Sequence, residues 1–124
     1  MASINHDVFD QGLTQISSTG TVLHLCSAEP ADYAAALATS LANKTGITVA
    51  APSDLPAGGR QVVVPEVTDG DTTGNAQATH WALLDVTLAA ERLLATEEID
   101  TPIDIVSGNM FATESFIIAI PDPL

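Results

Sequence analysis

Thr79-His80-Trp81-Ala82-Leu83-Leu84-Asp85 is the stretch around which the rest of this chain is organised. It contains the single tryptophan and lies in the longest run with strand character, residues 74–87. Successive side chains of a strand point to opposite faces, so Trp81 and Leu83 share one face and His80 lies on the other. We expect this run to be a long central strand against which shorter strands pack.

Two helices and a buried strand are expected before the central run. Asp7 can cap a short helix that ends near residues 17–20, and the helix has an apolar stripe. The stripe consists of Phe9, Leu13 and Ile16. Residues 21–27 are apolar on both strand faces, which is typical of a strand buried on both sides or at an interface. Residues 31–41 are Ala-rich and favour a short helix, although a docked loop also fits.

Short strands and turns account for the rest of the chain. Further strands are expected at residues 47–51, 60–64, 92–96, 103–106 and 111–120. Connections are expected at residues 43–46, 52–59, 69–71, 88–90, 97–102 and 107–109. About seven strands with regular turn signals predict an all-β, antiparallel β-sandwich of jelly-roll or immunoglobulin-like type. We expect one domain over residues 1–124, with residues 1–20 as an N-terminal arm.

The composition limits both the core and the partners. Hydrophobic residues make up 46% of the chain but aromatic residues only 4%, so small aliphatic side chains must fill the core. Aromatic side chains bury the most area, and a core with few of them favours further burial through oligomerisation. Three Lys and Arg against 16 Asp and Glu give a net charge of −13. This charge disfavours nucleic acid and anionic membrane surfaces.

Targeting and redox signals are sparse. Residues 1–7 lack the basic and apolar regions of a signal peptide, and no apolar run approaches the roughly 20 residues of a membrane-spanning helix. Cys26 is the single cysteine, so an intrachain disulfide is excluded. We expect synthesis in a cytoplasm.

No catalytic or metal constellation stands out. His80 and Asp85 resemble a base with its orienting acid, but five positions along a strand separate them by about 16 Å on opposite faces. His24 and Cys26 have metal-ligand spacing, yet a structural zinc site takes four ligands. Asp69-Gly70-Asp71 lacks the rest of a calcium loop, and Gly58-Gly59-Arg60 lacks a phosphate-loop pattern. We therefore expect no enzyme activity, no metal and no cofactor.

A group of carboxylates and the tryptophan have structural interpretations as well. Glu97, Glu98, Asp100 and Asp104 could serve glycoside chemistry, but charge runs of this kind are usually solvated. Trp81 is expected to anchor the core or an interface.

Several short pieces of the chain are similar to one group of known proteins. The pieces are Leu25-Cys26-Ser27-x-Glu29-Pro30-x-x-Tyr33, Asn43-Lys44-Thr45, Gly59-Arg60-x-Val62-x-Val64-Pro65, Asp69-Gly70 and Thr79-His80-Trp81-Ala82-Leu83-x-Asp85. They resemble small structural proteins of tailed bacteriophages and prophages, which are encoded among head and tail genes. The resemblance covers about residues 1–120. It implies a virion component made in the bacterial cytoplasm, and it supplies no catalytic residues.

Within a virion, a capsid decoration (cement) protein fits best. Such a protein needs no active site, gains stability by assembly around symmetry axes, and sits away from the packaged DNA. We expect it to bind the major capsid protein and copies of itself, as a trimer or higher ring. The expected contact residues are Phe9, Leu13, Ile16, Tyr33, Leu37 and Leu41. A tail, baseplate or glycan-binding module and a small cellular carbohydrate-binding or hydrolase domain remain as alternatives.

Overall fold

The central strand expected from the sequence is β6 (Ala76–Asp85), which has neighbours on both sides. The computed structural model describes residues 5–87 and 91–121. In it, β6 pairs antiparallel with β1 (Val22–Cys26) and with β7 (Arg92–Ile105). The all-β, antiparallel and sandwich-like architecture is confirmed.

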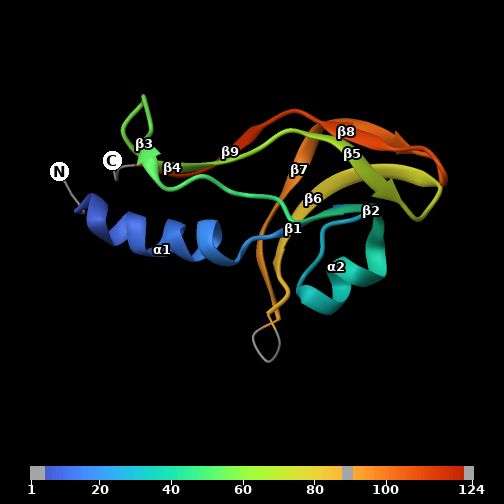
Figure 1. Ribbon diagram of the computed structural model, residues 1–124, viewed down its shortest axis with the longest axis horizontal. Coiled ribbons are helices and arrows are strands. Elements are labelled where there is room, and N and C mark those ends of the chain that lie inside the picture. Colours follow the sequence, from blue (N-terminus) through green and yellow to red (C-terminus); the bar gives the residue numbers. More distant parts are fainter. Residues whose placement is uncertain (1–4, 88–90, 122–124) are drawn as a thin grey trace.

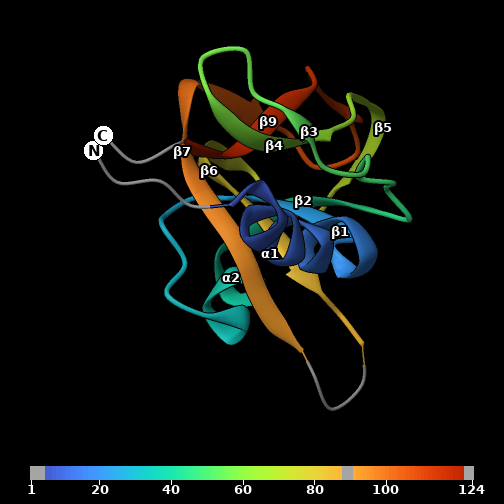
Figure 2. The ribbon, with the colours of Figure 1, turned by 90° about the vertical axis from the view of Figure 1, so that its left-hand side faces the viewer.

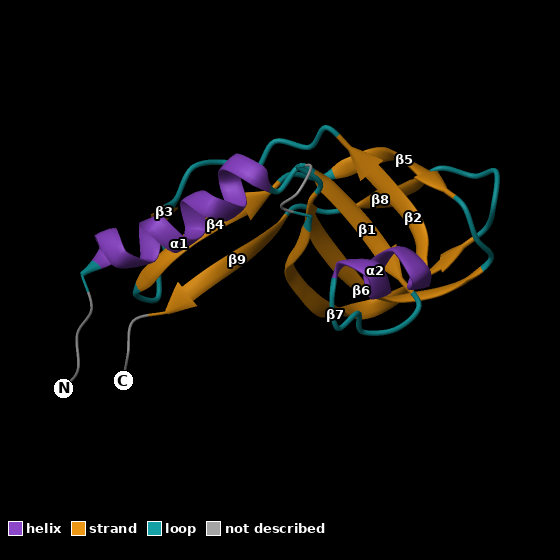
Figure 3. Ribbon diagram, turned by 90° about the horizontal axis from the view of Figure 1, so that it is seen from below, coloured by secondary structure: helices purple, strands orange, loops and turns teal. Residues whose placement is uncertain are grey.

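Six strands form one curled sheet in the order β7-β6-β1-β2-β5-β8. The other members are β2 (Ser40–Thr45), β5 (Val67–Thr72) and β8 (Phe111–Thr113). Figure 3 shows the strands of this sheet curving, and β7 and β8 are the first and last strands in its order. The curl follows from the twist that every strand has, which accumulates across neighbouring strands.

A smaller sheet projects from one end of the molecule. It contains β3 (Ser53–Asp54), β4 (Gly59–Val64) and β9 (Phe116–Pro121) in the order β3-β4-β9. Helix α1 (His6–Thr19) runs along this sheet (Figure 1), and Figure 2, which looks along the helix, shows β3 and β4 above it. The segment expected as an N-terminal arm is therefore helical from residue 6 and packs on the chain's own β4.

The cap of α1 differs from the expected one. The side chain of Asn5 accepts a hydrogen bond of 2.7 Å from the backbone N–H of Asp7, so Asn5 is the N-cap and Asp7 lies in the first turn. Asn and Asp are both preferred N-cap residues, because their side-chain oxygens accept hydrogen bonds from free N–H groups. The helix begins two residues earlier than a cap at Asp7 would place it. Arg60 ties the helix to the small sheet through Asp10, with an Nε to Oδ1 distance of 2.7 Å.

Apolar residues are buried on both faces of the large sheet. The main core lies between the concave face, α1 and the small sheet, and it includes Leu13, Leu23, Val62 and Leu83. A second cluster lies under α2 (Tyr33–Thr39) on the other face and contains Cys26, Ala36, Ala82 and Leu84. Strand β1 is buried at every position, which confirms the expectation of burial on both sides.

Several expected boundaries are wrong because strand pairing extends through residues that favour turns. Residues 43–45 belong to β2, 69–71 to β5 and 97–102 to β7, while 47–51 form no strand. The expected strand over 111–120 is divided into β8 and β9, which belong to different sheets. The expected helix at 31–41 and the turn at 107–109 are confirmed. The expected turn at 88–90 lies outside the described residues.

Gly70 explains why the turn predicted at residues 69–71 is wrong. It pairs with Phe111 inside the β5–β8 ladder, and a Cβ atom built at Gly70 would lie 1.9 Å from the Phe111 ring. The glycine is therefore explained by the close approach of an aromatic ring, which is another common reason for glycine in a strand.

Candidate functional site

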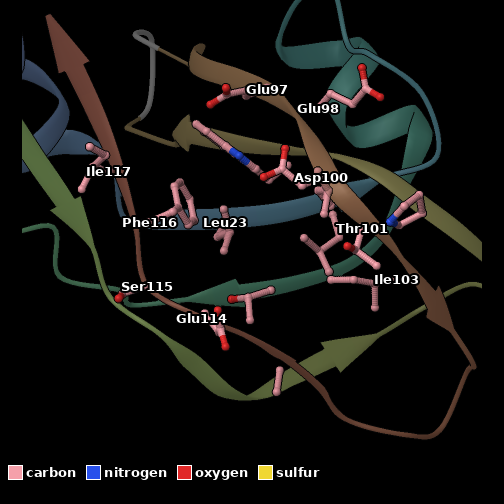
Figure 4. Close-up of a pocket in the computed structure, with 16 residues that line it drawn as sticks. Leu23, Glu97, Glu98, Asp100, Thr101, Ile103, Glu114, Ser115, Phe116 and Ile117 are labelled. Atoms are coloured by element: carbon pink, nitrogen blue, oxygen red, sulfur yellow. The ribbon is translucent and has the colours of Figure 1, made fainter. Parts of the chain in front are cut away.

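A groove lies between β7 and the β8–β9 segment. Its volume is about 670 Å³. Leu23 and Leu25 of β1 and Trp81 of β6 contribute from the concave face of the large sheet. One wall is residues 97–103 of β7, and the facing wall is residues 112–117 (Figure 4). The size lies in the range of ordinary ligand and peptide sites.

An aromatic pair joins the base of this groove to one of its walls. Trp81 is only 8% exposed, and its ring centroid lies 4.5 Å from that of Phe116 in a tilted arrangement. Trp81 comes from the large sheet and Phe116 from the small one. The expectation that Trp81 anchors packing is consistent with this contact.

Acidic side chains surround the groove. Glu97, Glu98 and Asp100 come from β7, and Glu114 comes from the segment between β8 and β9 on the other wall (Figure 4). All four residues are exposed. Three of them belong to the carboxylate group noted in the sequence, whereas Asp104 lines a smaller pocket with Ile103 and Phe111. The sequence feature that could have pointed to Glu114 as part of a site is its charge on the same strand face as Phe116 and Ile118.

The groove wall also contains an unsatisfied hydroxyl. Oγ1 of Thr113 is buried and has no hydrogen-bond partner among the described residues. By contrast, Thr96 of β7 donates a hydrogen bond of 2.7 Å to the backbone oxygen of Trp81. Burying a hydroxyl without a partner costs roughly 1–3 kcal/mol, so the two threonines contribute to stability with opposite sign.

The histidines and cysteine of the sequence analysis do not meet in one site. Nδ1 of His24 lies 2.7 Å from Oγ of Ser40, and burial lowers the pKa of His24. The thiol of Cys26 lies 3.6 Å from the backbone oxygen of Ala36, and burial raises its pKa. Within residues 5–87 and 91–121 no three potential metal ligands come together.

His80 and Asp85 also have separate partners. Nδ1 of His80 lies 2.9 Å from Oγ1 of Thr79. Asp85 is buried, accepts a hydrogen bond of 2.9 Å from the backbone N–H of Thr87, and forms an ion pair with Arg92. The hydrogen bonds from Thr87 and the charge of Arg92 hold the pKa of Asp85 below its usual value. Asp85 thus fixes the strand end beside β7.

A β-bulge changes the facing pattern expected around His80. The register between β6 and β7 shifts between Ala78 and His80. Ala78 consequently lies in the same core cluster as Trp81, although strict alternation placed it on the opposite face. The extra residue in a bulge reverses the facing of everything beyond it.

The six expected contact residues occupy different environments. Phe9 and Leu13 are buried beneath the small sheet, and Ile16 is half-buried beside the main core. Tyr33 and Leu41 are half-buried, whereas Leu37 on α2 is 47% exposed. Their role as contacts stays a prediction, and Leu37 is the one with the largest exposed fraction.

Comparisons with known proteins gave no relative. No protein family model matches the sequence, and neither curated proteins nor solved structures gave a significant match. Among the described residues, no helix is long and apolar enough to cross a membrane.

Proposed function

We propose that this chain is a non-enzymatic structural protein of a phage virion, most specifically a decoration protein that binds and stabilises the outer surface of the head. The observation that carries the proposal is the groove between the two ends of the curled sheet. It exposes apolar side chains beside strand edges, which are features of protein-docking surfaces. The similarity of its sequence pieces to phage structural proteins supplies the virion context.

The charge distribution supports a position on the outside of the head. Lys44, Arg60 and Arg92 each form an ion pair within the chain. Most of the 16 acidic residues have no such basic partner available, because the chain contains three bases in all. A surface of this kind repels packaged DNA and remains compatible with the solvent face of a capsid.

Glycan binding is the runner-up function, since carboxylates and an aromatic ring also occur in sugar-binding sites. In this groove the ring of Trp81 is nearly covered and contacts Phe116, so little of its face can stack on a sugar. The groove therefore favours a protein partner over a glycan.

Imaging of the particle that contains this protein tests the proposal. We expect density over the capsid lattice at a copy number comparable with that of the major capsid protein. Density confined to the tail, at a few copies, would support the baseplate alternative, and absence from the particle would contradict any virion role.

A variant pair tests the expected contact on α2. Leu37→Ser should lower the occupancy of the protein on purified heads that lack it. Val106→Ser is the control, because Val106 is similarly exposed, at 51%, and is not among the expected contact residues. Equal occupancy of both variants and the unchanged protein would show that Leu37 is not part of the interface.

A further inference from the structure

The two strands at the ends of the large sheet lie on either side of the groove. Strand β7 pairs with β6 on one side, and β8 pairs with β5 on one side. In the strand order of the described residues neither has a partner on its other side. Backbone N–H and C=O groups of a sheet edge form a template for an additional strand. The groove is thus the gap at which the curled sheet stays open.

The side chains of the groove specify what such a strand must carry. Leu23, Leu25 and Trp81 form the base of the groove, but their side chains are buried. The apolar side chains open to an occupant include Ile103 on one wall and Phe116 and Ile117 on the other. In an extended segment, alternate side chains point the same way at a spacing of about 6.6 Å. Alternating apolar residues can therefore contact these apolar wall residues while the intervening residues face the rim.

The rim specifies the charge of the intervening residues. Its acidic side chains are Glu97, Glu98, Asp100 and Glu114, and no Lys, Arg or His lies among the described residues that line the groove. Acidic residues on both walls repel one another, and the repulsion is relieved when a cation lies between them. The residues of the bound segment that face the rim are therefore expected to be Lys or Arg.

A second copy of this chain does not meet that requirement. The chain has three bases, and all three are engaged in ion pairs within the fold. They are also far apart in the sequence, at positions 44, 60 and 92, so no segment alternates apolar and basic residues. The charge thus points to a different protein as the occupant.

We propose that the groove between β7 and β8–β9 binds an extended segment of a partner protein in which apolar residues alternate with Lys or Arg. The segment runs along the free edge of β7, its apolar side chains contact Ile103 and Phe116 on the two walls, and its basic side chains pair with the acidic rim. This proposal deepens the proposed function, on which it rests for the identity of the partner as a virion protein.

A synthetic peptide of seven alternating lysine and valine residues provides the probe. Trp81 is the only tryptophan and lies at the base of the groove in contact with Phe116, so its fluorescence emission reports binding against that wall. At physiological salt we expect saturable binding with a shift in emission. A peptide of alternating lysine and serine has the same charge without apolar side chains, and we expect at least tenfold weaker binding and no shift.

Two charge-matched double variants locate the site. Glu97→Gln with Glu114→Gln removes one acid from each wall, and we expect the affinity for the lysine–valine peptide to fall about twofold to thirtyfold, the range for two exposed ion pairs. Glu29→Gln with Glu66→Gln removes the same charge at exposed positions outside the groove and should leave the affinity unchanged. Thermal unfolding of both variants verifies that each is folded.

Several results would overturn the proposal. Equal binding of the lysine–valine and lysine–serine peptides would mean that the interaction is nonspecific electrostatic attraction between a basic peptide and an acidic protein. Equal loss of affinity in the two double variants, or binding that leaves the Trp81 emission unchanged, would place the peptide elsewhere. The peptide assay and the imaging of particles are independent, so failure of the groove proposal leaves the location of the protein on the head to be judged by its density.

Discussion

Trp81 and Phe116 lie 35 positions apart in the chain, yet their ring centroids are 4.5 Å apart and connect the two sheets. Trp81 belongs to β6 at the centre of the large sheet, and Phe116 begins β9 of the small sheet. This contact is one of those that hold the small sheet against the curled sheet. Both residues also line the proposed binding groove.

Truncation of Phe116 should therefore weaken the junction of the sheets. Phe116→Ala removes the ring contact and part of a half-buried side chain, and we expect a loss of about 2 kcal/mol in the free energy of unfolding. The Trp81 emission should shift to longer wavelength as water reaches the indole. Ile117→Ala is the control, because Ile117 is 45% exposed on the same strand and should cost less than half as much. Denaturant titration followed by fluorescence measures both effects, and equal losses would contradict this role of Phe116.

Gly70 is predicted to tolerate no side chain. Gly70→Ala places a methyl group against the Phe111 ring, which is itself buried, and we expect a loss of about 1–3 kcal/mol from the resulting displacement. Gly12→Ala provides the contrast, because nothing lies within 4 Å of its added Cβ in α1. Alanine has the higher helix propensity, so this variant should gain about 0.5–1 kcal/mol. Thermal unfolding of the two variants should shift in opposite directions, and a shift in the same direction would contradict the packing described.

The two threonines near the groove give a second pair of opposite effects. Thr113→Val replaces a buried hydroxyl that has no partner with a methyl group, and we expect a gain of about 1 kcal/mol. Thr96→Val removes the hydrogen bond to the Trp81 backbone oxygen and should cost about 1 kcal/mol. Chemical denaturation at neutral pH measures both. A destabilised Thr113→Val variant would mean that its hydroxyl has a partner in solution.

His24 is predicted to make the protein less stable in mild acid. Burial lowers its pKa in the folded state, whereas the unfolded chain takes up a proton near the ordinary value of about 6.5. Between these two pKa values the unfolded state binds more protons, so the free energy of unfolding falls as the pH falls through this window. Below the folded pKa both states are protonated and the contribution is constant.

A substitution isolates this contribution. His24→Gln keeps a polar group near Ser40 but cannot titrate, so the slope of stability against pH just below 6.5 should become smaller. Denaturant midpoints at several pH values between 5 and 8 measure the slope. An unchanged slope in the variant would assign the acid sensitivity to other groups.

Much of the fold can be predicted from local patterns. The alternation around Trp81 identifies a long strand, the two apolar faces of residues 21–27 indicate burial on both sides, and the stripe of Phe9 and Leu13 indicates a helix. These predictions hold because strand and helix periods are imposed by the backbone itself. Boundaries failed where pairing with a distant strand outweighed turn propensity, as at 69–71 and 97–102.

The site depended more heavily on tertiary structure. From the sequence, the acidic residues between 97 and 104 are expected to lie in a solvated connection. Glu114 is a single charge, and by itself it does not indicate a binding site. The curl of the sheet brings residues 97–103 and 112–117 to opposite walls of one groove above Trp81. A bulge between Ala78 and His80 then sets which side chains face it.

The sequence alone thus determined the β-rich class, the acidic surface and the identity of the central strand, because composition and periodicity are local properties. The tertiary structure decided that the large sheet stays open between β7 and β8 and that apolar and acidic residues meet there. These features arise from accumulated strand twist and from pairing between segments far apart in the chain, which no local pattern contains.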